Sequence, residues 1–157
     1  MPDDLYRTDI VTWSRQQAER LRRHVGGERV NDLDWEHVIE EIEDLGNSEI
    51  TAVRSFLIQA MVHALKIARW PDSTAVNHWS GEAANFLQQA QDRYRRSMAR
   101  ELLVDTCFAK ARRTVLATTG DTSPQPIPDR TDLTLDALMD EAADLRALID
   151  NLGRTQG

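Results

Sequence analysis

The sequence predicts an all-α protein, a bundle of about five helices that forms a single domain over residues 1–157. Three observations lead to this prediction. Apolar residues recur at the 3.6-residue spacing of helices, no stretch alternates apolar and polar residues as a half-buried strand does, and Gly and Pro are scarce and clustered. A chain of 157 residues is also long enough to bury an ordinary core without disulfides or metals.

The first helix is expected to begin near Thr8 or Asp9, because either side chain can accept hydrogen bonds from the free amides of a first turn. Apolar residues then follow at helical spacing from Trp13 onward. Gly26 and Gly27 end this helix, since glycine tolerates the left-handed conformation at a helix C-terminus.

A long helix is expected from about Trp35 to Arg69, with Asp34 as its N-cap. Apolar and small residues keep one helical phase along it: Ile39, Ile42, Gly46, Ile50, Val53, Leu57, Met61, Ala64 and Ala68. A chain break at Gly46 would normally reset that phase. One helix that can bend at Gly46 is therefore favoured over two helices with Ser48 capping the second.

Two further helices are expected downstream, the first beginning at Ser80 and the second ending near Gly120. Whether they are separate stays open, because Ser97 is the only candidate break between them. A Pro-rich connector over residues 121–133 then blocks helix formation, since proline fixes φ and lacks an amide donor.

The last helix has the clearest predicted start. Thr134 is its N-cap, and Leu133 before it can pack on Leu138 as a hydrophobic staple. One continuous apolar stripe then runs to Leu152, and Gly153 ends the helix.

The charge pattern opposes binding to nucleic acids and to anionic membranes. Nineteen Lys and Arg against 26 Asp and Glu give a formal net charge of −7.

The N-terminus is acidic without a signal-peptide apolar region, and the most apolar stretch, residues 56–65, is far shorter than the about 20 residues of a membrane helix. The lone Cys107 cannot form an intrachain disulfide, which fits a reducing compartment. A cytoplasmic protein without a membrane anchor is expected.

Charges of opposite sign are segregated along the chain. Residues 31–50 contain eight acidic residues and no Lys or Arg, whereas arginines and lysines concentrate over residues 93–113. The acidic segment could be a solvated face, a docking surface, or a metal or catalytic carboxylate cluster. The basic segment predicts pairing with the acidic helix, within the bundle or across a homodimer. A nucleic-acid surface there is disfavoured, because aromatic residues are few and the net charge opposes it.

No metal or cofactor site is predicted. His37 and Glu41 stand at the i,i+4 spacing that can place two ligands on one metal, but the sequence has no Glu-x-x-His pair and no His-Glu-x-x-His motif. His63, with Lys66 one turn away, fits a core or edge residue that forms a hydrogen bond. On a continuous helix Glu41 and His63 would lie about 33 Å apart, too far to share a site within one subunit.

Several segments resemble one bacterial family. The segment DWEHVIEEIEDLGNSE, residues 34–49, is similar to the acidic L-I-E-E-I-E-x-L-G-x-S-E signature of the bacterial domain of unknown function 29 family. Residues 13–21 resemble its W-x-x-x-Q-x-x-x-L pattern, residues 61–66 its M-x-H-x-L-K segment, and residues 127–138 its Pro-rich, Thr-capped ending. The resemblance implies an all-helical bacterial protein whose activity is not established.

Two functions are compatible with these features. The leading hypothesis is a non-enzymatic interaction or structural protein that self-associates through its acidic and basic helices. The alternative is a hydrolase-like enzyme in which carboxylates of the acidic motif act with His63 and Lys66. No catalytic residue is assigned. The candidate functional surface consists of Glu40, Glu41, Glu49, His63 and Lys66.

Overall fold

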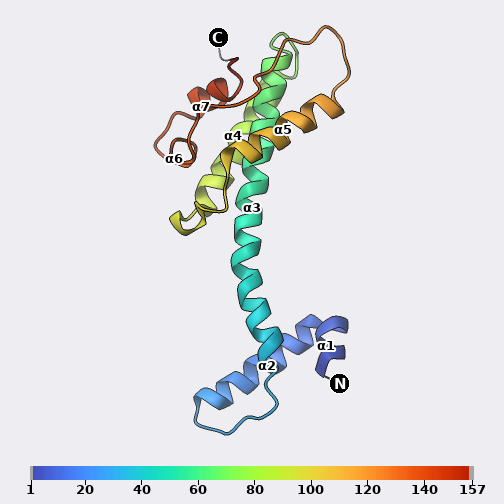
Figure 1. Cartoon of the computed structure of the whole chain (residues 1–157), viewed down its shortest axis with the longest axis vertical. Helices are drawn as coiled ribbons and strands as arrows, with labels where there is room; N and C mark the ends of the chain where they lie inside the picture. The colour runs from blue at the N-terminus through green and yellow to red at the C-terminus, as the bar shows by residue number, and fades with distance from the viewer. Residues whose placement is uncertain (1, 156–157) are drawn as a thin grey trace. The chain divides into compact units, whose positions relative to one another are not determined.

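The computed structural model describes the backbone of residues 2–155 and the side chains of residues 5–155 (Figure 1). It confirms the all-α prediction, since no strand occurs within that range. The elements are α1 (Pro2–Thr8), α2 (Ile10–Val25), α3 (Trp35–Arg69), α4 (Val76–Arg93), the 3-10 helix η1 (Arg96–Met98), α5 (Val104–Thr118), α6 (Leu135–Leu138) and α7 (Leu145–Leu152).

The chain divides into two compact units, Met1–Asn47 (unit 1) and Ser48–Gly157 (unit 2). The boundary falls inside α3, so both units contain a part of the same helix. Two compact units that share a helix need not fold independently, and the single domain over residues 1–157 therefore stays a prediction. Each unit is described separately below.

The predicted long helix is confirmed as one element, Trp35–Arg69. Gly46 does not interrupt it, and a Cβ atom added at Gly46 would meet nothing within 4 Å. Packing therefore does not require glycine at this position. By length and composition alone, α3 is also the one described helix that could cross a membrane, a property that the central core helices of many proteins share.

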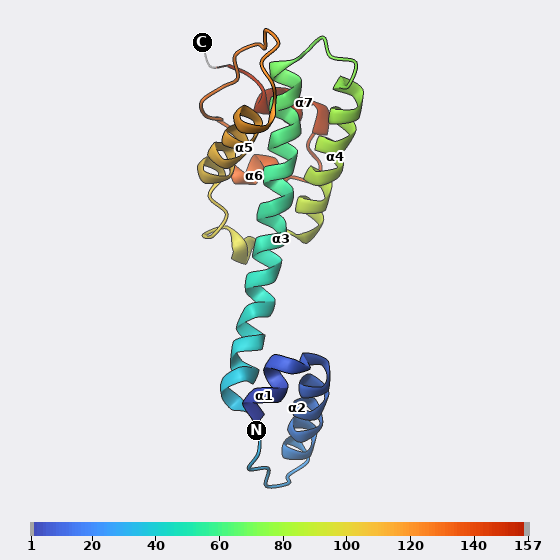
Figure 2. The same cartoon turned by 90° about the vertical axis from the view of Figure 1, so that its right-hand side faces the viewer.

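In unit 2 the core forms around the C-terminal part of α3. Figures 1 and 2 show α4 and α5 beside this part of the helix. The apolar phase predicted for α3 forms the centre of that core, because Val53, Leu57 and Met61 are fully buried. The other large, fully buried side chains are Leu65, Leu87, Leu102, Cys107, Phe108, Val115, Leu138 and Leu152.

The helices that follow α3 differ in part from the prediction. The fourth helix begins at Val76 rather than at Ser80, so the predicted start is one turn too late. The turn before α4 is closed by Ser73, whose hydroxyl accepts a hydrogen bond from the amide of Ala75 (3.1 Å). The sequence left open whether this helix and the next are separate. They are, since α4 and α5 are distinct helices joined through η1.

The prediction of one continuous last helix is wrong. Thr134 does cap a helix, accepting from the amide of Ala137 (3.2 Å), but this helix, α6, ends after four residues. Asp140 accepts from the amide of Ala142 (2.9 Å), and Asp144 then caps α7 by accepting from the amide of Arg146 (2.9 Å). These side-chain acceptors replace the helical bonds of the interrupted turn. The buried Gln91 of α4 donates to the carbonyl of Leu138 (2.9 Å) and thereby holds the end of α6.

Unit 1 contains α1, α2 and the first part of α3. The predicted cap of α2 is confirmed, because Asp9 accepts from the amide of Thr12 (3.0 Å). The predicted end is also confirmed at Gly26, and Gly27 has a φ of +93°, which glycine adopts readily. The short α1 was not predicted. Trp13 and Gln17 are the buried residues of α2.

Candidate functional site

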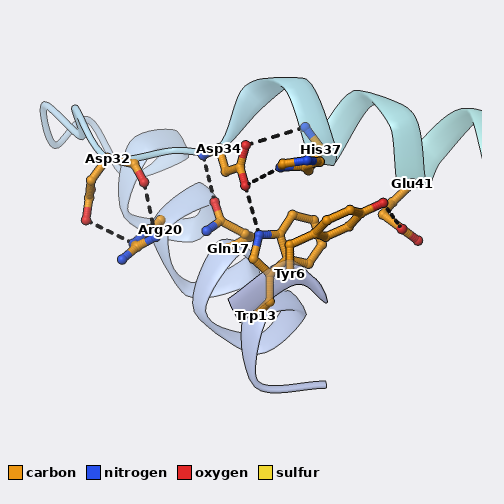
Figure 3. A network of polar contacts seen from close by, with 8 residues as sticks. All are labelled: Tyr6, Trp13, Gln17, Arg20, Asp32, Asp34, His37 and Glu41. Carbon is orange, nitrogen blue, oxygen red and sulfur yellow. Dashed lines mark hydrogen bonds and ion pairs between the residues drawn. The ribbon is translucent and has the colours of Figure 1, made fainter. Parts of the chain in front are cut away.

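A polar network in unit 1 joins α2 to the start of α3 (Figure 3). Asp34 lies at its centre, immediately before α3. Its Oδ2 accepts from Trp13 Nε1 (3.0 Å) and from His37 Nδ1 (2.7 Å). Gln17 Oε1 in turn accepts from the backbone amide of Asp34 (2.9 Å). The predicted N-cap of α3 is thus also the point at which α2 is attached.

Tyr6 of α1 extends this network along α3. Its hydroxyl donates to Glu41 Oε1 (2.7 Å), while its ring stacks on His37 at a centroid distance of 3.9 Å. The Tyr6 ring also meets the edge of Trp13 at 4.9 Å. We call Tyr6, Trp13, Gln17, Asp34, His37 and Glu41 the N-terminal network. It brings together residues that are distant in sequence, which is typical of a structural clamp.

The ionisation of Asp34 depends on this network. Burial acts to raise the pKa of its carboxyl, but hydrogen bonds from His37 and Trp13 outweigh burial and lower the pKa below its usual value. Asp34 is therefore charged at neutral pH, which suits both an N-cap and an acceptor for an indole N–H.

Tyr6 is expected to ionise unusually late. The hydrogen bond to Glu41, with smaller effects from burial and from the charges of Glu40, Glu41 and Asp44, raises its pKa from 10.0 to about 12. The difference in absorbance between wild type and Tyr6→Phe during an alkaline titration isolates this residue. We expect a midpoint near 12 in wild type and one nearer 10 in Glu41→Gln. Circular dichroism at the same pH checks that the fold persists, and equal midpoints in both proteins would contradict the Tyr6–Glu41 bond.

Beside the network, an apolar groove of about 420 Å³ lies between α2 and α3 of unit 1. It is lined from α2 by Trp13, Ala18 and Leu21 and from α3 by Val38, Ile42 and Leu45, with Ser14, Gln17 and Glu41 among the remaining lining residues. The lining is mostly apolar, so the groove suits aliphatic side chains better than a charged substrate.

The first part of α3 exposes apolar side chains. Ile39 is 53% exposed, Ile42 63% and Leu45 70%. We call these three residues the α3 stripe. Ile39 and Ile42 have the same helical phase as the buried residues of unit 2, so the apolar face of α3 continues from a core into solvent. Large apolar side chains grouped in this way mark an interaction surface more often than scattered ones do.

Four exposed carboxylates lie on the first part of α3, on a helix face largely opposite Ile42 and Leu45: Glu36, Glu40, Glu43 and Asp44. We call them the acidic row. No ion pair joins them to any residue within 5–155, so they do not pair with the basic helices inside the described part of the chain. Glu49 is the acidic-motif residue that pairs with the basic segment, through Arg93 Nη1 at 3.3 Å.

The remaining candidate residues lie on the second part of α3. His63 stacks on Phe86 of α4 at 5.8 Å, and its Nδ1 has no hydrogen-bond partner in the part of the chain that the structure describes. The predicted hydrogen bond of His63 is therefore not found for this atom. Burial lowers the pKa of His63, and the charge of Lys66 lowers it further.

The candidate surface is thus divided between the two units. Glu40 and Glu41 belong to unit 1, while Glu49, His63 and Lys66 belong to unit 2. His63 and Lys66 are electrostatic neighbours, and Glu41 binds Tyr6 instead. Among residues 5–155, no three His, Cys, Asp or Glu side chains group as metal ligands would.

Sequence reasoning missed the N-terminal network as a unit, although a signal for it was present. The spacing Asp34-Trp35-Glu36-His37 is an Asp-x-x-His pair, in which an N-cap carboxylate meets a histidine in the first turn. The partners from the preceding helices, Tyr6 and Trp13, could not be read from local spacing.

The fold and this site together define an all-α protein organised on one long helix, with a polar clamp at the start of that helix. The chain belongs to the family described as "Domain of unknown function DUF29", whose model matches residues 5–143. None of the curated proteins matches the sequence.

The chain is also similar to a solved structure, that of an alpha-helical protein of unknown function from Rhodospirillum rubrum ATCC 11170. The two are 25% identical, with a TM-score of 0.67, and the match covers 95% of this chain and 98% of the other. This similarity confirms the helical fold and leaves the function to be argued from the site.

Proposed function

We propose that the protein is a non-enzymatic helical interaction protein that self-associates by burying the α3 stripe. The observation that carries the proposal is the exposure of Ile39, Ile42 and Leu45 on α3. In the later part of the same helix, the apolar side chains are buried in a core. Covering these side chains releases about 25 cal/mol for each Å² of apolar surface removed from water. The apolar groove between α2 and α3 adds to the same surface.

The arrangement of candidate catalytic residues favours interaction over catalysis. Glu41 accepts a hydrogen bond from the hydroxyl of Tyr6, and Glu40 is exposed. His63 and Lys66 belong to the other unit. A general acid or base must come within hydrogen-bond reach of the proton it transfers, and these groups do not converge on one reacting atom within a unit.

The proposal places the protein in the bacterial cytoplasm, without a membrane or nucleic-acid partner. The Rhodospirillum origin of the similar structure supports a bacterial source. The burial of the free thiol of Cys107, which raises its pKa, supports a structural cysteine in a reducing compartment.

Self-association is expected to depend on Ile42, which with Leu45 belongs to both the α3 stripe and the groove. Wild type should be a dimer at micromolar concentration. Ile42→Glu places a charge in the buried surface and should raise the dissociation constant about 100-fold, on the scale of a central interface residue. Light scattering coupled to size exclusion and sedimentation equilibrium measure the mass and the constant.

Leu116→Glu is the matched control. Leu116 is also an exposed apolar residue, 41% exposed, but it lies on α5 of unit 2. Its replacement should leave the dissociation constant within about 2-fold of wild type, as expected for a residue outside the interface. A wild-type protein that remains a monomer throughout the micromolar range would overturn the proposed function.

A further inference from the structure

We propose that unit 2 contains a binding site for a small zwitterion, an α-amino acid, in a pocket of about 400 Å³ at the C-terminal end of α3. Arg69 binds the carboxylate of the ligand, and Asp72 binds its ammonium group. All the residues that line the pocket belong to unit 2. The inference goes beyond the proposed self-association, which concerns the α3 stripe of unit 1.

Two segments that are distant in sequence form the walls of this pocket. One is residues 69–73, at the end of α3 and in the turn that follows it, and the other is the connector at Ser123 and Gln125. Figures 1 and 2 show the connector passing this end of α3. The amide of Gln125 donates to the carbonyl of Arg69 (2.8 Å), and a proline on each side of Gln125 restricts the backbone. The walls are therefore held in place before a ligand binds, which lowers the entropy cost of binding.

Arg69 offers a positive charge that the protein leaves unpaired. Its guanidinium lies over the ring of Trp70, 5.1 Å from the ring centroid, and forms no ion pair within residues 5–155. Its Nε is buried and has no hydrogen-bond partner in the same range. Partial burial without an acceptor is unfavourable for a charged group, and an anion bound to the guanidinium offsets the lost hydration.

The end of α3 does not use Arg69 as a capping group. A cation in the last turn of a helix often binds the terminal carbonyl groups. Here the carbonyl of Lys66 accepts from the amide of Trp70, and that of Trp70 accepts from the amide of Ser73. The carbonyl of Arg69 itself is bound by Gln125. Backbone amides thus satisfy these carbonyls, and the guanidinium is left for a ligand.

Asp72 supplies the opposite charge in the same pocket. It is exposed and joins no ion pair in the part of the chain that the structure describes, not even to Arg69 three residues earlier. A simple anion would be repelled by Asp72, a dianion such as phosphate most strongly, and a simple cation would be repelled by Arg69. A ligand whose carboxylate and ammonium groups are joined by one carbon can use both residues.

The uncharged part of the lining suits a ligand rich in hydrogen-bonding groups. Ser73, Thr122 and Ser123 each contribute a hydroxyl-bearing side chain to the lining. The Ser73 oxygen already accepts from the amide of Ala75, so its O–H proton is available to donate to a carboxylate. Ser123 has a φ of +56°, a left-handed conformation that is uncommon outside glycine. Residues held in such conformations are concentrated at ligand sites.

Nitrogen-15 NMR of the full chain tests the site through the Nε–H resonance of Arg69, which Arg69→Lys identifies by its loss. Glycine should shift this resonance to saturation with a dissociation constant of about 1–10 mM, as expected for a ligand of this size. Acetate and methylammonium each carry only one of the two charges and should bind at least about 10-fold more weakly. No saturation by about 100 mM glycine would overturn the site. Acetate or phosphate binding as tightly as glycine would overturn the zwitterion.

Asp72→Asn removes only the partner of the ammonium group. It should weaken glycine binding about 10-fold, to the level of acetate, without weakening acetate. Asp121→Asn is the matched control, because Asp121 is an exposed carboxylate beside the pocket-lining Thr122 but does not itself line the pocket. Its glycine affinity should stay within about 2-fold of wild type. Equal losses in both variants would overturn the pairing with Asp72. A monomeric wild type that binds glycine would remove the proposed function and leave this site.

Discussion

Leu57→Ala is expected to lower the free energy of unfolding by about 2–5 kcal/mol, the range for a fully buried leucine. Leu57 has no exposed surface and lies at the centre of the unit 2 core. The loss combines the transfer of the removed methyl and methylene groups with a cavity that the surrounding side chains cannot close completely. Chemical denaturation followed by circular dichroism measures the effect.

Ile39→Ala provides a matched control on the same helix. Ile39 precedes Leu57 by 18 residues, five turns of an α-helix, so the two side chains have the same helical phase. Ile39 is 53% exposed, and its replacement should change the unfolding free energy by less than about 1 kcal/mol when dimerisation is avoided by dilution. Equal losses in both variants would mean that both halves of this face are buried in the monomer, contrary to the structure.

Asp34→Ala is expected to destabilise unit 1, with a loss of about 1–3 kcal/mol. The side chain of Asp34 is 11% exposed and accepts hydrogen bonds from Trp13 and His37. Its removal leaves the indole N–H of Trp13 without an acceptor and takes away the N-cap of α3. Amide hydrogen exchange of α2 should accelerate, while that of the α3 core in unit 2 should not.

The stabilisation that Asp34 provides is expected to decrease as the pH falls. Because its pKa is lowered in the folded state, its stabilising contribution is complete above the unfolded value of 3.8 and is lost as the pH falls through the lower folded value. The indole N–H resonance of Trp13, followed by nitrogen-15 NMR, should titrate with a midpoint below 3.8. Asp34→Asn keeps one acceptor and should abolish this titration. A midpoint above 3.8 would contradict the network.

The sequence predicted α3 well because its bounds depend on local chemistry. Asp34 caps it, Pro71 follows it, and one apolar phase continues through Gly46. The last helix was mispredicted for an equally local reason. The apolar stripe there keeps helical spacing through Asp140 and Asp144, but both carboxylates bind backbone amides and interrupt the helix. Periodicity alone does not reveal that competition.

The candidate site was less predictable, because its contacts are tertiary. Asp34 was expected to be a cap, yet no local pattern links its carboxylate to the indole N–H of Trp13. Glu41 was predicted as part of the candidate functional surface and stands at i,i+4 from His37, whereas its hydrogen-bond partner is Tyr6, 35 residues earlier. The exposure of Ile39 and Ile42 was also unpredictable, since their spacing is the same as that of core residues.

The middle of α3 differs from its C-terminal part in what the opening of its backbone hydrogen bonds disrupts. Gly46, Asn47 and Ser48 are consecutive poor helix formers, all exposed, at the boundary between the units. Opening the backbone hydrogen bonds there disturbs no buried side chain, whereas opening those around Leu57 disrupts a core. We therefore expect amide protons in the two regions to exchange by different routes, the first by local fraying and the second by cooperative unfolding.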